Sequence, residues 1–387
     1  MNHTPGNPHL NSIINKIIDH PIYDRFLRLL KQYEILKIYD CHSHVSSGPN
    51  DIIEGVHSTL RPEYPFFVRD IQCFYDQLFE SRGIETVSIV FDTPLPVYDM
   101  DQKNKELLEE PDVTKIDAKQ QIIPFAVVTP DMTDEQIQLY LYMGAKGFKI
   151  TPRTPSSQIK KKTINEISLF EMIHPYALTI ADERGLPMLL HLPQRVVSPR
   201  IRQSIKDELL QIAQNYSGIK IILAHLGQAQ TLHKINDILP WIEAHNLYDQ
   251  VWMDISAVTV SSVLATALSG NVKLLYGTDI DFALTEQGRY FAYKVINGKR
   301  VLADDDNSDK VITALVSTHF GNQLKEFIQS QKINLNYPML VAQWEGILDA
   351  VDTLKRSGTQ DARIKLILED LFFRNDEQLL GVNSNNE

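Results

Sequence analysis

The sequence is poor in cysteine and has no long apolar run. Only Cys41 and Cys73 occur among its 387 residues, so we expect no disulfide framework. No apolar run approaches the roughly 20 residues of a membrane-spanning helix. The first residues, Met1 to Gly6, lack the basic-then-apolar order of a secretory signal. These absences predict a cytoplasmic protein with no membrane partner.

Positive charge is also scarce. The chain has 38 Lys and Arg against 49 Asp and Glu, which gives a formal net charge of -11. A nucleic-acid partner would need clustered Lys and Arg to neutralise phosphates. The basic run Lys160 to Lys162 is most simply a solvated surface. We therefore expect no nucleic-acid partner.

Eight β-prone segments alternate with helical ones. Continuous apolar runs such as 85–92 are typical of parallel strands that are buried on both faces. The predicted strands are 35–38, 85–92, 122–130, 147–150, 186–191, 219–225, 251–254 and 272–276. Helices are predicted at 67–81, 133–143, 169–183, 198–215, 235–245 and 263–268. This order predicts an α/β fold, a (β/α)8 TIM barrel. The rival, a doubly wound sheet, would show a Gly-rich phosphate loop after the first strand, and the sequence has none there.

The two ends of the chain are predicted to be helical extensions of the barrel. Apolar residues from Asn11 to Tyr33 recur at helical spacing, interrupted at Pro21. Segment 290–301 is typical of a strand or a loop, and helices are expected at 310–327 and 339–355. We divide the chain into an N-terminal helical extension, 1–34, and a barrel with C-terminal helices, 35–387.

Two histidines follow the first predicted strand. The two-residue period of a strand sends His42 and His44 to the same face. Imidazole nitrogen suits zinc and its first-row neighbours, and a catalytic site needs further protein ligands. Catalytic residues in such barrels come from the C-terminal ends of different strands, so the sequence predicts a metal site there. Further candidates at or just past these strand ends are Lys149, His191, His225 and Asp279.

Five segments carry a resemblance to a known family. YDCHSHV, GAKGFKI, LPMLLHLP, IKIILAHLG and LLYGTDID occur in this order. Together they resemble the amidohydrolase superfamily, specifically its amidohydrolase-related (amidohydrolase 2) branch, which also contains metal-dependent decarboxylases. The tail LFFRNDEQLLGV resembles the closing helix of that branch. The likeness runs with gaps from Ile35 to Val382.

The resemblance implies a set of roles for the site residues. His225 is implied to be a catalytic or substrate-polarising residue that could also touch a second metal. Lys149 has three roles open: a carboxylated bridge between two metals, an ammonium that pairs with a substrate anion, or a buried lysine neutralised by Asp40. We expect one divalent ion, Zn2+ first and Mn2+ or Fe2+ as alternatives, and a second ion if Lys149 is carboxylated. Dimers are common in this branch, so a homodimer is expected. The implied metal ligands are His42, His44, His191 and Asp279.

The residue types fit a hydrolase that acts on an amide, ester or lactone-like bond of a small molecule. A divalent ion held by imidazoles and a carboxylate lowers the pKa of bound water towards about 7 and polarises a substrate oxygen. Asp279 would accept the proton of the water, and His225 would stabilise charge on the attacked carbonyl. The alternative is a metal-dependent decarboxylase, in which protonated His225 or Asp279 delivers the proton that replaces carbon dioxide. A non-catalytic ligand-binding barrel is the least favoured hypothesis.

Four more polar residues lie near the expected site. Asp254 ends the seventh strand and could bind substrate, hold His225 or cap a helix. Asp40 shares the parity of the two histidines and could orient a ligand imidazole. Arg153 and Arg195 follow the fourth and fifth strands, where they could bind a substrate carboxylate or phosphate.

Overall fold

Two helices lead into the barrel. The computed structural model describes residues 8–45, 66–94, 98–114, 120–152, 167–193, 199–284, 289–296, 299–302, 312–316 and 338–382. Helices α1 (Pro8–Ile18) and α2 (Pro21–Gln32) confirm the helical lead-in that is broken at Pro21. Proline is tolerated at the first position of α2 because its missing N–H would have no partner there. His20 caps α2, since its Nδ1 accepts a hydrogen bond from the Ile22 N–H at 3.3 Å.

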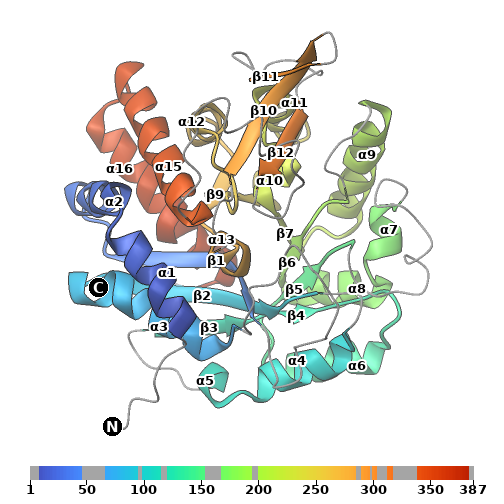
Figure 1. Cartoon of the computed structure of the whole chain (residues 1–387). Helices are drawn as coiled ribbons and strands as arrows, with labels where there is room; N and C mark the ends of the chain where they lie inside the picture. The colour runs from blue at the N-terminus through green and yellow to red at the C-terminus, as the bar shows by residue number, and fades with distance from the viewer. Residues whose placement is uncertain are drawn as a thin grey trace.

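Parallel strands form the centre of the molecule (Figure 1). They are β1 (Lys37–Val45), β2 (Glu85–Asp92), β3 (Gln120–Pro124), β4 (Ala126–Val127), β5 (Phe148–Ile150), β6 (Pro187–Leu190), β7 (Lys220–Leu223), β8 (Val251–Asp254) and β9 (Lys273–Leu275). Two sheets result, with the orders β1-β2-β3 and β4-β5-β6-β7-β8-β9.

The two sheets meet at both edges. β3 and β4 are one predicted strand that is split at Phe125, whose N–H donates to the Val90 carbonyl at 2.8 Å. At the other edge the Cys41 N–H in β1 donates to the Tyr276 carbonyl just past β9 at 2.9 Å. The order of the strands and these junctions give the chain the TIM-barrel fold that the sequence predicts.

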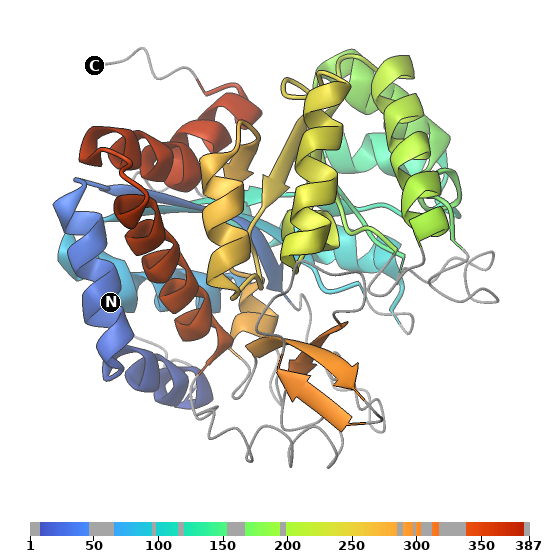
Figure 2. The ribbon, with the colours of Figure 1, turned by 90° about the horizontal axis from the view of Figure 1, so that it is seen from above.

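Helices surround the strands (Figures 1 and 2). They are α3 (Val68–Phe79), α4 (Met100–Glu109), α5 (Pro111–Thr114), α6 (Asp134–Tyr142), α7 (Leu169–Met172), α8 (Pro175–Arg184), α9 (Pro199–Asn215), α10 (His225–Gln228), α11 (Leu232–Ala244), α12 (Ser261–Ser269) and α13 (Ile280–Ala283). The prediction of one helix over 169–183 was wrong, because α7 and α8 are separate. Pro175 takes the first position of α8, and the Nδ1 of His174 accepts from the Tyr176 N–H at 3.2 Å. Gly185 ends α8 in the left-handed conformation, φ 63°, as predicted.

The two ends of the chain pack together. The C-terminal elements are α15 (Met339–Arg356), α16 (Asp361–Glu369), the π-helical turn η4 (Asp370–Arg374) and α17 (Asn375–Leu380). The rings of Phe26 in α2 and Trp344 in α15 stack with centroids 4.7 Å apart. Lys37 at the start of β1 pairs with Glu377 at 3.1 Å, and Lys220 at the start of β7 donates to the Leu379 carbonyl. Helix α17 therefore lies at the N-terminal ends of the strands.

A small antiparallel sheet follows α13. It consists of β10 (Arg289–Ile296), β11 (Lys299–Leu302) and β12 (Ile312–Val316) in the order β11-β10-β12, drawn in orange in Figure 2. The helix predicted from residue 310 was wrong at 312–316, where pairing with β10 outweighs the helical spacing of the sequence. The remainder of that predicted helix lies outside the described residues.

Apolar side chains of the strands and the flanking helices form the hydrophobic core. Within the described ranges, none of the helices combines the length and the apolar character needed to cross a membrane.

Candidate metal centre

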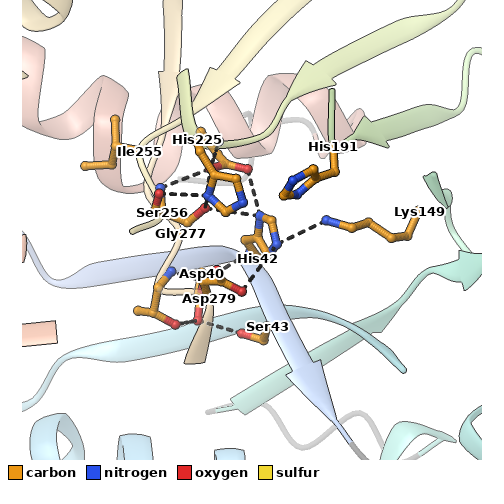
Figure 3. A network of polar contacts seen from close by, with 12 residues as sticks. Asp40, His42, Ser43, Lys149, His191, His225, Ile255, Ser256, Gly277 and Asp279 are labelled. Carbon is orange, nitrogen blue, oxygen red and sulfur yellow. Dashed lines mark hydrogen bonds and ion pairs between the residues drawn. The ribbon is translucent and has the colours of Figure 1, made fainter. Parts of the chain in front are cut away.

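The candidate site residues gather at the C-terminal ends of the parallel strands (Figure 3). They come from six different strands or strand ends that are far apart in the sequence. They are His42 and His44 in β1, Lys149 in β5, His191 past β6, His225 past β7, Asp254 at the end of β8 and Asp279 past β9.

One group consists of His42, His44 and Asp279. Asp279 Oδ1 lies 3.2 Å from His44 Nε2 and 3.6 Å from His42 Nε2. The backbone directs this carboxylate, because Asp279 is left-handed (φ 58°) and its N–H donates to the His42 carbonyl at 2.7 Å. Gly277 permits the close approach: a Cβ there would lie 2.9 Å from His42 Cβ.

Asp254 holds His42 from the other side of the ring. Its Oδ2 lies 2.9 Å from His42 Nδ1, and its Oδ1 accepts from the N–H groups of His225 at 2.9 Å and Ser256 at 3.0 Å. Both Asp254 and His42 are fully buried. A carboxylate in this place typically orients a metal-ligating imidazole. Both oxygens of Asp254 are therefore engaged within the protein.

Ser256 joins the site although the sequence analysis missed it. Its hydroxyl donates to Asp254 Oδ1 and lies 2.9 Å from His225 Nδ1 and 3.2 Å from His42 Nδ1. A serine just past a strand has no distinctive chemistry in the sequence. Its two-residue spacing from Asp254 was the one signal that could have pointed to a shared face.

The short element α10 is a left-handed turn after β7, not a regular helix. His225, Leu226, Gly227 and Gln228 have φ values of 56°, 54°, 63° and 65°. This backbone costs a residue other than glycine about 1–2 kcal/mol, and such strain concentrates at functional sites. Glycine suits the third position also because a Cβ there would lie 2.9 Å from Ile238 Cδ1. The sequence missed Gln228, because only this turn brings it to the site.

His191 lies beside this turn. Its Nε2 is 3.3 Å from Gln228 Nε2, and its ring centroid is 5.0 Å from that of His225. Among the described residues, the groups whose ligand atoms all lie within 4.8 Å of one another are His42, His44 and Asp279, and His42, His225 and Asp254. The structure thus brings three of the four implied ligands together and places His191 next to His225.

Lys149 is buried against His42. Its Nζ lies 3.1 Å from His42 Nε2 and 4.5 Å from the centroid of the Phe91 ring, whose face attracts a cation. The ammonium thus stands at the imidazole nitrogen that faces away from Asp254. The neutralising partner considered for it from the sequence, Asp40, is engaged elsewhere.

Asp40 fixes backbone rather than an imidazole. Asp40 pairs with Ser88 and Ser43 pairs with Val90, so β1 contains one extra residue between them. This bulge breaks the alternation that put Asp40 on the face of the histidines. Its carboxylate accepts from the N–H groups of His42 and Thr278 and from the hydroxyls of Ser43, Tyr75 and Thr278.

The electrostatics keep the rings neutral and the carboxylates ionised. Burial, followed by the charge of Lys149, lowers the pKa of His42 to about 3, and burial lowers the pKa of His44. Burial alone would raise the pKa of Asp279, but its electrostatic interaction with His42 and the hydrogen bond from His44 hold it well below its usual range. Burial also opposes ionisation of Asp254, yet His42, His225 and Ser256 lower its pKa to about 2.

The residues present fit a divalent metal ion. Two neutral imidazoles and an ionised carboxylate are ligands that zinc and its first-row neighbours prefer, and ligands must be deprotonated to bind. Asp254 occupies His42 Nδ1, so His42 would hold an ion through Nε2, the nitrogen that Lys149 Nζ also approaches at 3.1 Å. His44 Nδ1 is buried without a hydrogen-bond partner among the described residues. The candidate substrate contacts Arg153 and Arg195 lie outside those residues.

Solved structures resemble the chain at low identity. One is an amidohydrolase II (13% identity, 89% of this chain and 99% of that chain covered, TM-score 0.48). Another is a probable 2-pyrone-4,6-dicarboxylic acid hydrolase from Acinetobacter baumannii with citric acid bound (15%, 89% and 99%, 0.45). A third is an amidohydrolase 2 from Bifidobacterium longum subsp. infantis (12%, 90% and 100%, 0.46). Likeness at this level carries no argument about activity.

Sequence comparison is more decisive. No curated protein sequence matches the chain significantly. The model of the family described as Amidohydrolase (Amidohydro_2), however, matches residues 39–323, which is well over half of the chain and contains every residue of the metal centre. The chain therefore belongs to the amidohydrolase family of metal-dependent enzymes.

Proposed function

We propose that the protein is a metal-dependent hydrolase that acts on an amide, ester or lactone-like bond of a small molecule. The observation that carries the proposal is the carboxylate of Asp279, 3.2 Å from His44 Nε2 and 3.6 Å from His42 Nε2. Asp254 holds the opposite nitrogen of His42, which is the arrangement expected around a catalytic ion. Membership of the amidohydrolase family supports the same class of reaction.

His42, His44 and Asp279 would hold the ion, and we propose that His191 joins them. Zinc is the metal we propose, with Mn2+ or Fe2+ as alternatives, because imidazole and carboxylate ligands suit all three. When bound, the ion supplies Lewis acidity towards water and towards a substrate oxygen.

Asp279 is the proton carrier of the proposed reaction. Its pKa is held low by the neighbouring imidazoles, so the carboxylate is ionised at neutral pH and can accept the proton of the attacking water. The same low pKa lets it pass the proton on to the leaving group.

His225 carries its ring proton on a defined nitrogen. Its Nδ1 lies 2.9 Å from the carbonyl oxygen of Ser256, which can only accept, so a neutral ring is protonated at Nδ1. Its Nε2 then has a lone pair and accepts a proton or hydrogen bond from substrate or water. Stabilising negative charge on an attacked carbonyl would instead require the doubly protonated ring.

One observation favours the second candidate, a metal-dependent decarboxylase. The buried ammonium of Lys149 beside His42 offers a counter-charge for a substrate carboxylate. A protonated His225 would then deliver the proton that replaces carbon dioxide. Release of carbon dioxide, rather than of an acid with an amine or alcohol, separates this reaction from hydrolysis.

The first experiment measures metal per chain. Protein purified without added metal is analysed by elemental mass spectrometry beside His42→Ala/His44→Ala and a control, Asp376→Asn, whose carboxyl lies in α17. We expect about one equivalent of zinc that the double variant loses and the control keeps. About two equivalents would assign Lys149 as a carboxylated bridge. Absence of metal even after reconstitution would overturn the proposal.

The second experiment measures turnover on a panel of small esters, lactones, amides and carboxylic acids. Asp279→Asn should lower kcat by about 100-fold or more, as expected for loss of a general base. Unchanged turnover in Asp279→Asn that still binds metal would refute the role of Asp279.

A further inference from the structure

Two site imidazoles from distant parts of the chain share one anchor. His42 comes from β1 and His225 from the turn after β7, yet the Nδ1 atoms of both face the end of β8. His42 Nδ1 lies 2.9 Å from Asp254 Oδ2 and 3.2 Å from Ser256 Oγ. His225 Nδ1 lies 2.9 Å from both the carbonyl oxygen and the hydroxyl of Ser256. In Figure 3 the His225 ring lies between Ser256 on one side and His191 on the other.

The partners decide where the ring protons lie. A backbone carbonyl oxygen only accepts, so His225 Nδ1 must donate to Ser256. An ionised carboxylate also only accepts, so His42 Nδ1 must donate to Asp254. The hydroxyl of Ser256 has one proton, which it gives to Asp254 Oδ1, and its oxygen therefore faces both rings as an acceptor.

We propose that Asp254 and Ser256 form a single anchor that fixes His42 and His225 in the same Nδ1-protonated form. Both Nε2 lone pairs then face away from the anchor, that of His42 towards Lys149 and Asp279. Asp254 and Ser256 are positioning residues, because they act through the two rings. The tautomers follow from the contacts alone. Only the use of the two Nε2 lone pairs, by a metal ion and by substrate, rests on the proposed function.

The anchor predicts a selective effect of one substitution. Asp254 Oδ1 is surrounded by three donors, the N–H groups of His225 and Ser256 and the Ser256 hydroxyl. In Asp254→Asn these three donors still need an acceptor, so the amide oxygen stays at the Oδ1 position. The NH2 group must then take the Oδ2 position, where it faces His42 Nδ1. His42 then becomes an acceptor at Nδ1, and its proton moves to Nε2. His225 keeps its form, because the Ser256 carbonyl is unchanged.

The test is histidine NMR on metal-free protein labelled with ¹⁵N-histidine. Two-bond ¹H–¹⁵N correlations distinguish the two tautomers, and His42→Gln and His225→Gln assign the signals. We expect Nδ1–H for both rings in the wild-type protein. In Asp254→Asn we expect Nε2–H for His42 and no change for His225. Asp40→Asn is the matched control, because Asp40 is an equally buried carboxylate whose hydrogen bonds go to backbone and hydroxyl groups.

Zinc affinity gives a second readout. Competition with a chromophoric chelator should show a loss of about 10- to 100-fold in Asp254→Asn, the usual effect of removing a carboxylate behind a ligand imidazole. Ser256→Ala should keep both tautomers, because it retains the carbonyl, and Ser43→Ala is its control on the neighbouring Asp40 network.

Several results would overturn the anchor. They are Nε2–H at either ring of the wild-type protein, an unchanged His42 in Asp254→Asn, or a switch in Asp40→Asn as well. If Asp254→Asn does not fold, the wild-type spectrum decides alone. A chain with these tautomers that turned over no substrate would refute the proposed function and leave the anchor in place.

Discussion

Two buried aspartates at opposite ends of the barrel have pKa values that are shifted in opposite directions. Asp254 at the metal centre and Asp376 in α17 are both 0% exposed. Each oxygen of Asp254 accepts at least one hydrogen bond, and its pKa is lowered to about 2. Neither oxygen of Asp376 has a hydrogen-bond partner among the described residues. Burial, followed by the charges of Asp40 and Asp254, raises the pKa of Asp376 well above its usual range.

The difference shows that burial alone does not define a functional carboxylate. Donors stabilise the ionised form at one end, where the charge is needed to orient His42. At the other end, burial without a donor among the described residues favours the protonated form of Asp376. A shifted pKa therefore indicates a site only together with geometry.

The largest expected effect is on activity, and it comes from the aspartate at the metal centre. Asp254→Asn should lower kcat/KM by about 100- to 10,000-fold, because an amide in place of a carboxylate leaves the histidine in the wrong tautomer, as in serine proteases. Steady-state kinetics on whichever substrate of the proposed panel is turned over measure the change. Asp376→Asn is the control and should stay within about twofold. An equal loss of kcat/KM in both variants would show that Asp254 has no special role at the metal centre.

The next effect concerns the support that helix α15 gives to the metal centre. Gln343 in α15 donates to the carbonyls of Ile255 at 2.9 Å and Gly277 at 2.8 Å, beside Ser256 and the Asp279 turn. Gln343→Leu removes both hydrogen bonds and leaves the Ile255 carbonyl with the Val258 N–H at 3.1 Å. The loss should lower the free energy of unfolding by roughly 1–3 kcal/mol, mainly because the Gly277 carbonyl loses its donor. Urea unfolding measures the change.

The exposed Gln77 in α3 provides the control for Gln343. Gln77→Leu should change the free energy of unfolding by less than about 0.5 kcal/mol. Equal stability of Gln343→Leu and the wild-type protein would mean that another group satisfies the Gly277 carbonyl.

The fold and much of the metal centre were predictable from the sequence for one reason. Parallel strands buried on both faces have continuous apolar runs, so strand ends can be read, and β2 and β8 match their predicted ranges 85–92 and 251–254. Residues at such ends meet at one edge of the barrel, which locates His42, His44 and Asp279.

The features that the sequence analysis missed depend on backbone geometry, which single residues do not encode. The bulge in β1 turns Asp40 from the histidine face, and nothing in Tyr39-Asp40-Cys41 signals an extra residue. The left-handed turn that brings Gln228 to His191 contains one glycine, too little to predict four positive φ values. β12 exists because β10 pairs with it, a contact between distant segments.

At the opposite end of the barrel, removing the buried carboxyl of Asp376 in α17 should stabilise the protein. Asp376→Ala should raise the free energy of unfolding at about pH 7 by about 1–3 kcal/mol, since a buried polar group without a partner costs this much. Alanine also favours the helix more than aspartate does. Chemical unfolding of metal-free protein gives the value. Destabilisation would show that Asp376 makes a contact worth more than its burial costs.

The smallest effect is the pH dependence of that gain, and its sign follows from the raised pKa. Unfolded Asp376 ionises near pH 3.9, whereas the folded group keeps its proton to higher pH. Between the two pKa values the folded state binds more protons, so wild-type stability falls as the pH rises. Asp376→Ala lacks this term, and its advantage should therefore be smaller at about pH 4 than at about pH 8. Unfolding of both proteins across this range measures the difference, in which the titration of other groups largely cancels. An advantage that shrank as the pH rose would mean that Asp376 is ionised and stabilised in the folded state, and the two ends of the barrel would then not differ.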